Sequence, residues 1–62
     1  MNGLNRKARI LVADDDRRIR SALESILESE GYEVLQAGSG TETLEAIRKG
    51  SPDVILLDIR CL

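Results

Sequence analysis

The sequence predicts an α/β domain whose strands lie parallel in one sheet, in the order strand, helix, strand, helix, strand. Two short apolar runs, residues 10–13 and 54–57, are typical of strands that are buried within a parallel sheet. The stretches between them contain apolar residues at helical spacing, and both include a glycine at the expected helix end. Strands that alternate with helices in this way indicate parallel pairing through crossover connections.

The first strand is predicted over residues 8 or 9 to 13, after a polar lead-in over residues 1–7 that we expect to be disordered. Asp16 is a plausible N-cap for a helix over residues 17–30. The apolar residues of this helix predict one buried stripe, which consists of Ile19, Ala22, Leu23, Ile26 and Leu27. Gly31 follows at the position where helices often end in the left-handed conformation.

A second strand is predicted over residues 32–37 and a second helix over residues 41–49. Either Ser39 or Thr41 can cap this helix. Its buried side is expected to hold Leu44, Ile47 and Ala46. The glycines on either side of Ser39 are compatible with a phosphate-binding loop, but the nucleotide fingerprint follows a first strand, so a turn with a helix cap is favoured.

The third strand is predicted over residues 53–57, after a helix end at Gly50 and a break at Pro52. The first and third strands are the most uniformly apolar, so we expect them to be neighbours inside the sheet. The second strand then lies outside, which gives the strand order 2-1-3. Crossovers between parallel strands are right-handed in about 98% of cases, so the reversal of direction after the second strand places one helix on each face.

Carboxylates follow the two apolar strands directly, as Asp14 and Asp15 after the first and as Asp58 after the third. Open α/β sheets bind ligands at the carboxyl ends of their strands, where the strand order reverses. Three carboxylates at one edge repel one another unless a cation joins them, and hard oxygen ligands suit Mg²⁺. The sequence therefore predicts a magnesium site at this edge, with Asp16 favoured as a helix cap over a fourth ligand.

Size and composition exclude several classes of protein. The chain has 62 residues and a net charge of −2 with both signs interspersed, which permits one small domain and does not suggest a nucleic-acid partner. It has no histidine, which excludes Ser-His-Asp catalysis, and its single cysteine, Cys61, cannot form an internal disulfide. Its apolar runs are far shorter than the roughly 20 residues that cross a bilayer, so we expect a cytoplasmic protein without a membrane partner.

These motifs resemble the receiver domain of bacterial two-component response regulators. The resemblance covers residues 8–60 and rests on the strand that runs into Asp14 and Asp15, the capped helix that ends at Gly31, and the strand that runs into Asp58. It implies a flavodoxin-like half domain, so that residues 8–62 would be the first half of a receiver. It also implies a signalling domain rather than an enzyme.

The resemblance implies a role for each acidic residue. Asp58 would accept a phosphoryl group from a phosphohistidine on a histidine kinase, with Mg²⁺ as the cofactor. Asp15 would bind the ion directly, Asp14 mainly through water, and the backbone carbonyl of Arg60 would add a further oxygen. The start of the first helix would contribute to kinase docking, although Arg17, Arg18 and Arg20 are most simply a solvated helix face.

The family's phosphate-contacting hydroxyl and lysine residues, on its fourth and fifth strands, have no counterpart in this sequence, and Leu62 stands where the family often has proline. We therefore expect a truncated receiver in which phosphoryl acceptance is impaired. An exposed third-strand edge would favour self-association. The alternative function is thus a self-associating half domain without chemistry of its own. A phosphate hydrolase is a weaker alternative, because no acid–base residue is placed for it.

Overall fold

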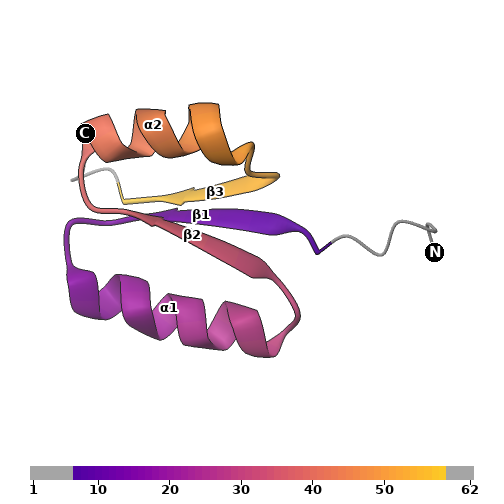
Figure 1. The fold of residues 1–62 in the computed structure, drawn as a ribbon. Helices are drawn as coiled ribbons and strands as arrows, with labels where there is room; N and C mark the ends of the chain where they lie inside the picture. Colours follow the sequence, from indigo (N-terminus) through magenta and orange to yellow (C-terminus); the bar gives the residue numbers. More distant parts are fainter. Residues whose placement is uncertain (1–6, 59–62) are drawn as a thin grey trace.

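Three parallel strands form one sheet in a computed structural model of the chain, which describes residues 7–58 (Figure 1). The central strand β1 (Arg9–Ala13) pairs with β2 (Glu33–Ala37) on one side and with β3 (Val54–Leu57) on the other. The order β2-β1-β3 confirms the predicted topology. The expected disorder of residues 1–7 falls almost wholly outside the described part of the chain.

The two helices, α1 (Arg17–Ser29) and α2 (Gly40–Gly50), lie on opposite faces of the sheet (Figure 1). This arrangement confirms the prediction of one helix on each face of a flavodoxin-like half domain. The turns that lead from β1 to α1 and from β2 to α2 lie at the same edge of the sheet, where β3 also ends (Figure 1). The carboxyl ends of all three strands therefore meet there.

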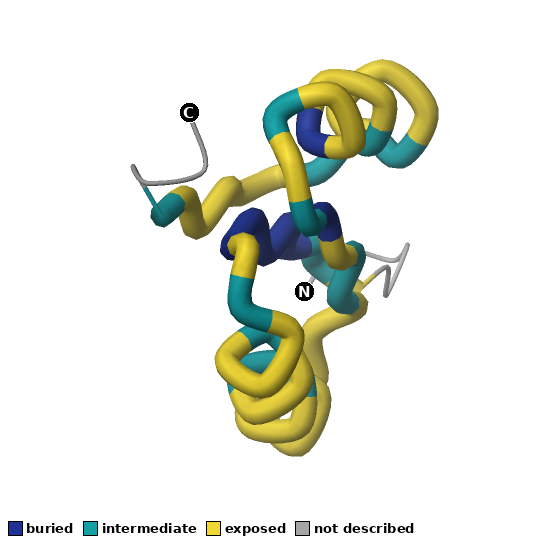
Figure 2. The backbone as a smooth tube through the Cα atoms, turned by 90° about the vertical axis from the view of Figure 1, so that its left-hand side faces the viewer, coloured by how far each residue is buried: buried dark blue, intermediate teal, exposed yellow. Residues whose placement is uncertain are grey.

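The buried core is centred on β1, which runs through the middle of the molecule in Figure 2. Leu11 and Ala13 pack with Ala37 of β2, and the partly buried Leu35 and Ala46 complete this cluster on the α2 face. Fully burying a leucine or valine side chain stabilises a fold by about 1.5–3 kcal/mol. With so few fully buried side chains among the described residues, the fold depends on β1 more than on any other element.

Helix α1 has the predicted ends but only part of the predicted buried stripe. Gly31 has a φ of 95°, which confirms the left-handed stop after the helix. Leu23 and Leu27 are half-buried, as predicted. The prediction was wrong for the other three members of the stripe, Ile19, Ala22 and Ile26, which are exposed. The reason is geometric: α1 packs on β1 and β2, and this contact is too narrow to cover a five-residue stripe.

Helix α2 begins at Gly40, with Ser39 as its N-cap, which decides between the two predicted caps. The Ser39 hydroxyl oxygen accepts a hydrogen bond of 3.1 Å from the backbone N–H of Glu42. The predicted role of Gly50 was wrong in part, because Ser51 adopts the left-handed conformation, with a φ of 47°. Gly50 is instead the last helical residue, where a Cβ would lie 2.5 Å from the Leu35 Cδ1 atom. A larger residue there would require the Leu35 side chain to move.

The buried face of α2 also differs from the prediction. Ala46 is half-buried, as predicted, and Thr43, which was not predicted to be buried, is buried. The prediction was wrong for Leu44, which is 66% exposed, and for Ile47, which is also exposed. Thr43 satisfies its hydroxyl within the helix by donating a 2.7 Å hydrogen bond to the Ser39 carbonyl. Small residues at positions 43, 46 and 50 allow the helix to lie close to β2, which turns the larger side chains away from the sheet.

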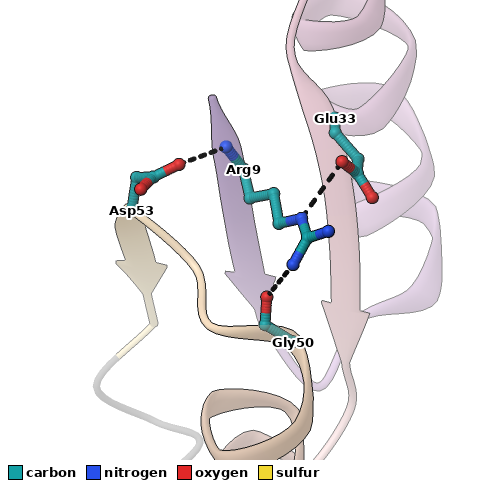
Figure 3. Close-up of polar contacts among 4 residues, drawn as sticks. All are labelled: Arg9, Glu33, Gly50 and Asp53. Atoms are coloured by element: carbon teal, nitrogen blue, oxygen red, sulfur yellow. Dashed lines mark hydrogen bonds and ion pairs between the residues drawn. The ribbon is translucent and has the colours of Figure 1, made fainter. Parts of the chain in front are cut away.

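Hydrogen bonds from Arg9 connect the amino ends of the strands (Figure 3). The Arg9 guanidinium donates a 2.6 Å hydrogen bond to the Gly50 carbonyl and a 3.1 Å hydrogen bond to Glu33. The Arg9 backbone N–H also donates to the Asp53 carboxylate at 2.8 Å. Arg9 thus links β1 to β2, to the end of α2 and to the segment that leads into β3.

We predict that Arg9→Met lowers the free energy of unfolding by about 1–2 kcal/mol, because it removes a charge-assisted bond to the partly buried Gly50 carbonyl. The exposed ion pair with Glu33 adds little to this value. Urea denaturation followed by circular dichroism measures the change. Arg48→Met, at an exposed position on α2, is the matched control, and equal losses in the two variants would contradict the prediction.

Candidate functional site

The register of β1 and β3 places two carboxylates side by side. Ala13 pairs with Leu57, so Asp14 and Asp58 each follow the last residue of a paired strand. The Asp58 backbone N–H donates to the Ala13 carbonyl at 2.9 Å, and that of Asp14 donates to the Ala37 carbonyl at 3.1 Å. Both aspartates thus continue the sheet by one residue, and their main chains are fixed by the neighbouring strands.

The structure brings together the three aspartates that the sequence singled out. Carboxylate oxygens of Asp14, Asp15 and Asp58, one from each residue, all lie within 4.8 Å of one another. Asp14 is only 8% exposed, Asp15 is exposed and Asp58 lies between these extremes. The predicted convergence of these side chains is confirmed, whereas their roles are not tested by geometry alone. The predicted backbone ligand at Arg60 lies outside the described residues, as does Cys61.

The Asp14 side chain is oriented by its own loop. Its Oδ1 atom accepts a 2.8 Å hydrogen bond from the backbone N–H of Asp16. Asp16 in turn caps α1, since its Oδ1 atom accepts a 2.9 Å hydrogen bond from the backbone N–H of Arg18. The predicted cap is therefore confirmed, and the acidic loop is continuous with the start of the helix.

A hollow of about 270 Å³ lies beneath this edge of the sheet. Its lining combines the two strand-end carboxylates with apolar side chains and consists of Val12, Ala13, Asp14, Leu23, Leu56, Leu57 and Asp58. The two carboxylates therefore have apolar neighbours, which screen a charge less than water does.

The donor set fits a small divalent cation. Octahedral Mg²⁺ with oxygen ligands at 2.0–2.1 Å requires ligand oxygens no more than about 4.2 Å apart. Oxygens that already lie within 4.8 Å of one another need only a small side-chain movement, or a water in place of one direct bond. Carboxylates and water are the ligands that Mg²⁺ normally takes in proteins. Asp14, Asp15 and Asp58 would hold the ion.

Arg20 is a site neighbour that the sequence did not reveal. It was predicted to lie on a solvated helix face, but its guanidinium donates a 2.6 Å hydrogen bond to the Asp14 carbonyl and a 2.9 Å hydrogen bond to Gln36. A signal was present in the spacing, because Arg20 shares a helical face with Leu23 and Leu27, which pack toward the sheet.

Comparison with known proteins agrees with this arrangement. The family model described as the response regulator receiver domain matches residues 10–61. The chain belongs to this family. Receiver domains of response regulators are signalling modules of two-component systems, and the three converging aspartates lie within the matched segment.

Similar curated proteins are transcriptional regulators. The chain is 44% identical over 59 residues to the probable transcriptional regulator ycf27 of Galdieria sulphuraria, a match that covers 95% of this chain and 23% of that protein. It is 42% identical over 53 residues to the DNA-binding response regulator MtrA of Mycobacterium tuberculosis, which covers 86% of this chain and 23% of that protein. The chain thus spans about a quarter of the length of these relatives.

Within residues 7–58, neither helix has the length and apolar composition that a bilayer span requires.

The Asp16 cap makes a pH-dependent contribution to stability. Hydrogen bonding from the Arg18 backbone N–H, helped by the Arg18 side chain, holds the pKa of the Asp16 carboxyl below its ordinary value of 3.8. A pKa that is lower in the folded than in the unfolded chain stabilises the fold above the unfolded value. That contribution is lost as pH falls through the lowered pKa of the folded state.

We therefore expect the parent chain to lose stability relative to Asp16→Asn as the pH is lowered from neutrality to about 3, because asparagine caps without a charge. Urea midpoints of the two proteins across this range measure the difference. A difference that is the same at all pH values would contradict a contribution from the ionised cap.

Proposed function

We propose that this chain is the phosphoacceptor part of a two-component receiver and takes a phosphoryl group from a histidine kinase onto Asp58 with Mg²⁺ bound. The observation that supports this most directly is the convergence of three carboxylate oxygens within 4.8 Å at the carboxyl edge of a parallel sheet. If these aspartates served only to cap helices, Asp58 would not need to lie beside Asp14 and Asp15, because it follows a different strand.

In this proposal, a carboxylate oxygen of Asp58 attacks the phosphorus atom of the donor. A new O–P bond forms as the N–P bond of the phosphohistidine breaks, and the imidazole nitrogen leaves with the electron pair and takes up a proton. The partly buried position of Asp58, with its main chain bonded to β1, orients the nucleophile before the donor arrives.

Bound Mg²⁺ would neutralise the negative charge that otherwise keeps a carboxylate and a phosphoryl group apart. Asp15, which is exposed, is suited to bind the ion directly. Asp14 already gives one oxygen to the Asp16 backbone N–H, and its remaining oxygen suits a water-mediated contact. Between unit charges about 4.8 Å apart, repulsion is about 1 kcal/mol in bulk water and several-fold larger near a protein surface.

The kinase would approach over the loop between β1 and α1. Arg17, Arg18 and Ile19 are exposed at the start of α1, next to the acidic edge, and offer both charge and apolar surface. We place the module in the cytoplasm, since histidine kinases are phosphorylated by ATP there. The single cysteine also gives no reason to expect an oxidising compartment.

Titration with Mg²⁺ and beryllofluoride, which mimics a bound phosphoryl group, tests the proposal. Amide resonances of residues at the acidic edge should shift with Mg²⁺ alone and shift further with beryllofluoride. Asp58→Asn should abolish the beryllofluoride response, and Asp15→Asn should weaken the Mg²⁺ response by at least about tenfold, because each removes a charged oxygen ligand.

Asp53→Asn is a matched control, since Asp53 lies at the opposite edge of the sheet and bonds to the Arg9 backbone. Its response to both reagents should equal that of the parent chain. If the parent chain fails to respond to Mg²⁺, or if Asp58→Asn responds to beryllofluoride as the parent does, the phosphoacceptor proposal is wrong.

A second function, self-association, is supported by the exposure of β3. This strand pairs with β1 alone among the described strands, and its four apolar residues are each between 41% and 48% exposed. An unpaired apolar edge strand is a template for pairing with another chain. We propose that two copies pair their β3 strands antiparallel about a twofold axis, which would join two three-stranded sheets into one.

We predict that the parent chain dimerises in sedimentation velocity and that Ile55→Lys, within β3, shifts it to monomer by placing charge at the paired edge. Ile26→Lys is the control, because Ile26 is also an exposed isoleucine but lies on α1. A parent chain that stays monomeric at high concentration, or equal effects of the two substitutions, would contradict pairing through β3.

A further inference from the structure

Arg20 joins the acidic loop to the far strand of the sheet. Its Nη1 atom donates to the Asp14 carbonyl at 2.6 Å, and its Nε atom donates to Gln36 Oε1 at 2.9 Å. The Gln36 amide in turn donates to Glu24 Oε1 at 2.7 Å, so Gln36 is bonded to two residues of α1. The guanidinium is therefore held by partners on two elements, and it reaches the site through the main chain rather than through a carboxylate.

The bond to the Asp14 carbonyl completes the fixation of that residue. The Asp14 backbone N–H is bonded to Ala37, its Oδ1 atom to the Asp16 N–H, and its carbonyl oxygen to Arg20. Main chain and side chain are thus restrained together. Loss of the carbonyl bond would free the peptide between Asp14 and Asp15 to rotate. Such a rotation would move the Asp15 carboxylate and the Asp16 N–H that holds Asp14 Oδ1.

The loop after β2 leaves room for this guanidinium. A Cβ at Gly38 would lie 3.0 Å from Arg20 Nη1 and 3.4 Å from Glu42 Oε1. Both neighbours are already engaged, since Glu42 Oε1 accepts a 2.7 Å hydrogen bond from the Gly38 N–H. An alanine at this position would push the Arg20 head group by a few tenths of an ångström without removing its charge.

We propose that Arg20 is a positioning residue for the cation site, which it keeps in a binding geometry by holding the Asp14 carbonyl. This inference rests on the proposed Mg²⁺ function and adds a residue to it. Position and charge have opposite expected effects here. A nearby positive charge weakens binding of a cation, so removal of Arg20 would tighten Mg²⁺ binding if charge alone mattered. Loss of positioning instead weakens binding.

Mg²⁺ titration of the 62-residue chain separates these effects. We expect Arg20→Gln to weaken Mg²⁺ binding about tenfold, because losses of this size are common when a residue that holds a metal ligand is replaced. Arg48→Gln, an equal change of charge at an exposed position on α2, should leave binding unchanged. Arg20→Lys should recover part of the affinity by restoring one donor, and Gly38→Ala should weaken binding with the charge retained.

Amide hydrogen exchange without metal gives a second readout. The Asp16 N–H, which is bonded to Asp14 Oδ1, should exchange faster in Arg20→Gln than in Arg48→Gln. If Arg20→Gln does not fold, Gly38→Ala and Arg20→Lys provide both measurements. Unchanged exchange together with Mg²⁺ binding as tight as in Arg48→Gln would overturn the positioning role. Faster exchange in a protein that does not bind Mg²⁺ would support positioning and reject the proposed function.

Discussion

The register between β1 and β3 is the constraint on which the site depends. Because Ala13 is opposite Leu57, the residues that follow them meet at one edge, on the same face of the sheet. A slip of one residue would turn Asp58 to the other face and separate it from Asp14. The apolar residues of β1 are almost fully buried, so such a slip would disrupt the core as well as the site.

The same edge combines rigid main chain with charged side chains. Backbone N–H groups of Asp14 and Asp58 continue the ladder, which leaves their carboxylates at fixed starting positions. Helix α1 then begins two residues after the exposed Asp15, with Asp16 as its cap. The loop is therefore held at both ends, so its backbone stays fixed although it brings several negative charges close together. Folding thus places like charges together, and a bound cation would relieve their repulsion.

The sequence predicted the strands, the helices, their order and the three converging aspartates, since each follows from apolar runs and strand-end residues. It predicted the burial of Ala46 but not that of Thr43. Hydrophobicity favoured Leu44 and Ile47, whereas close packing on β2 favours small side chains. The contact of Arg20 with the Asp14 carbonyl was also missed, since long cationic side chains on a helix usually extend into solvent.

The Arg9 group and the aspartate group lie at opposite ends of β1, a strand of five residues that is about 16 Å long. Physiological salt screens interactions between exposed charges beyond about 8 Å. The binding of a doubly charged anion at one end would therefore change the electrostatic potential at Arg9, at the other end, only slightly. The charge at the aspartate end can therefore change while the Arg9 contacts that hold the other end of the sheet stay the same.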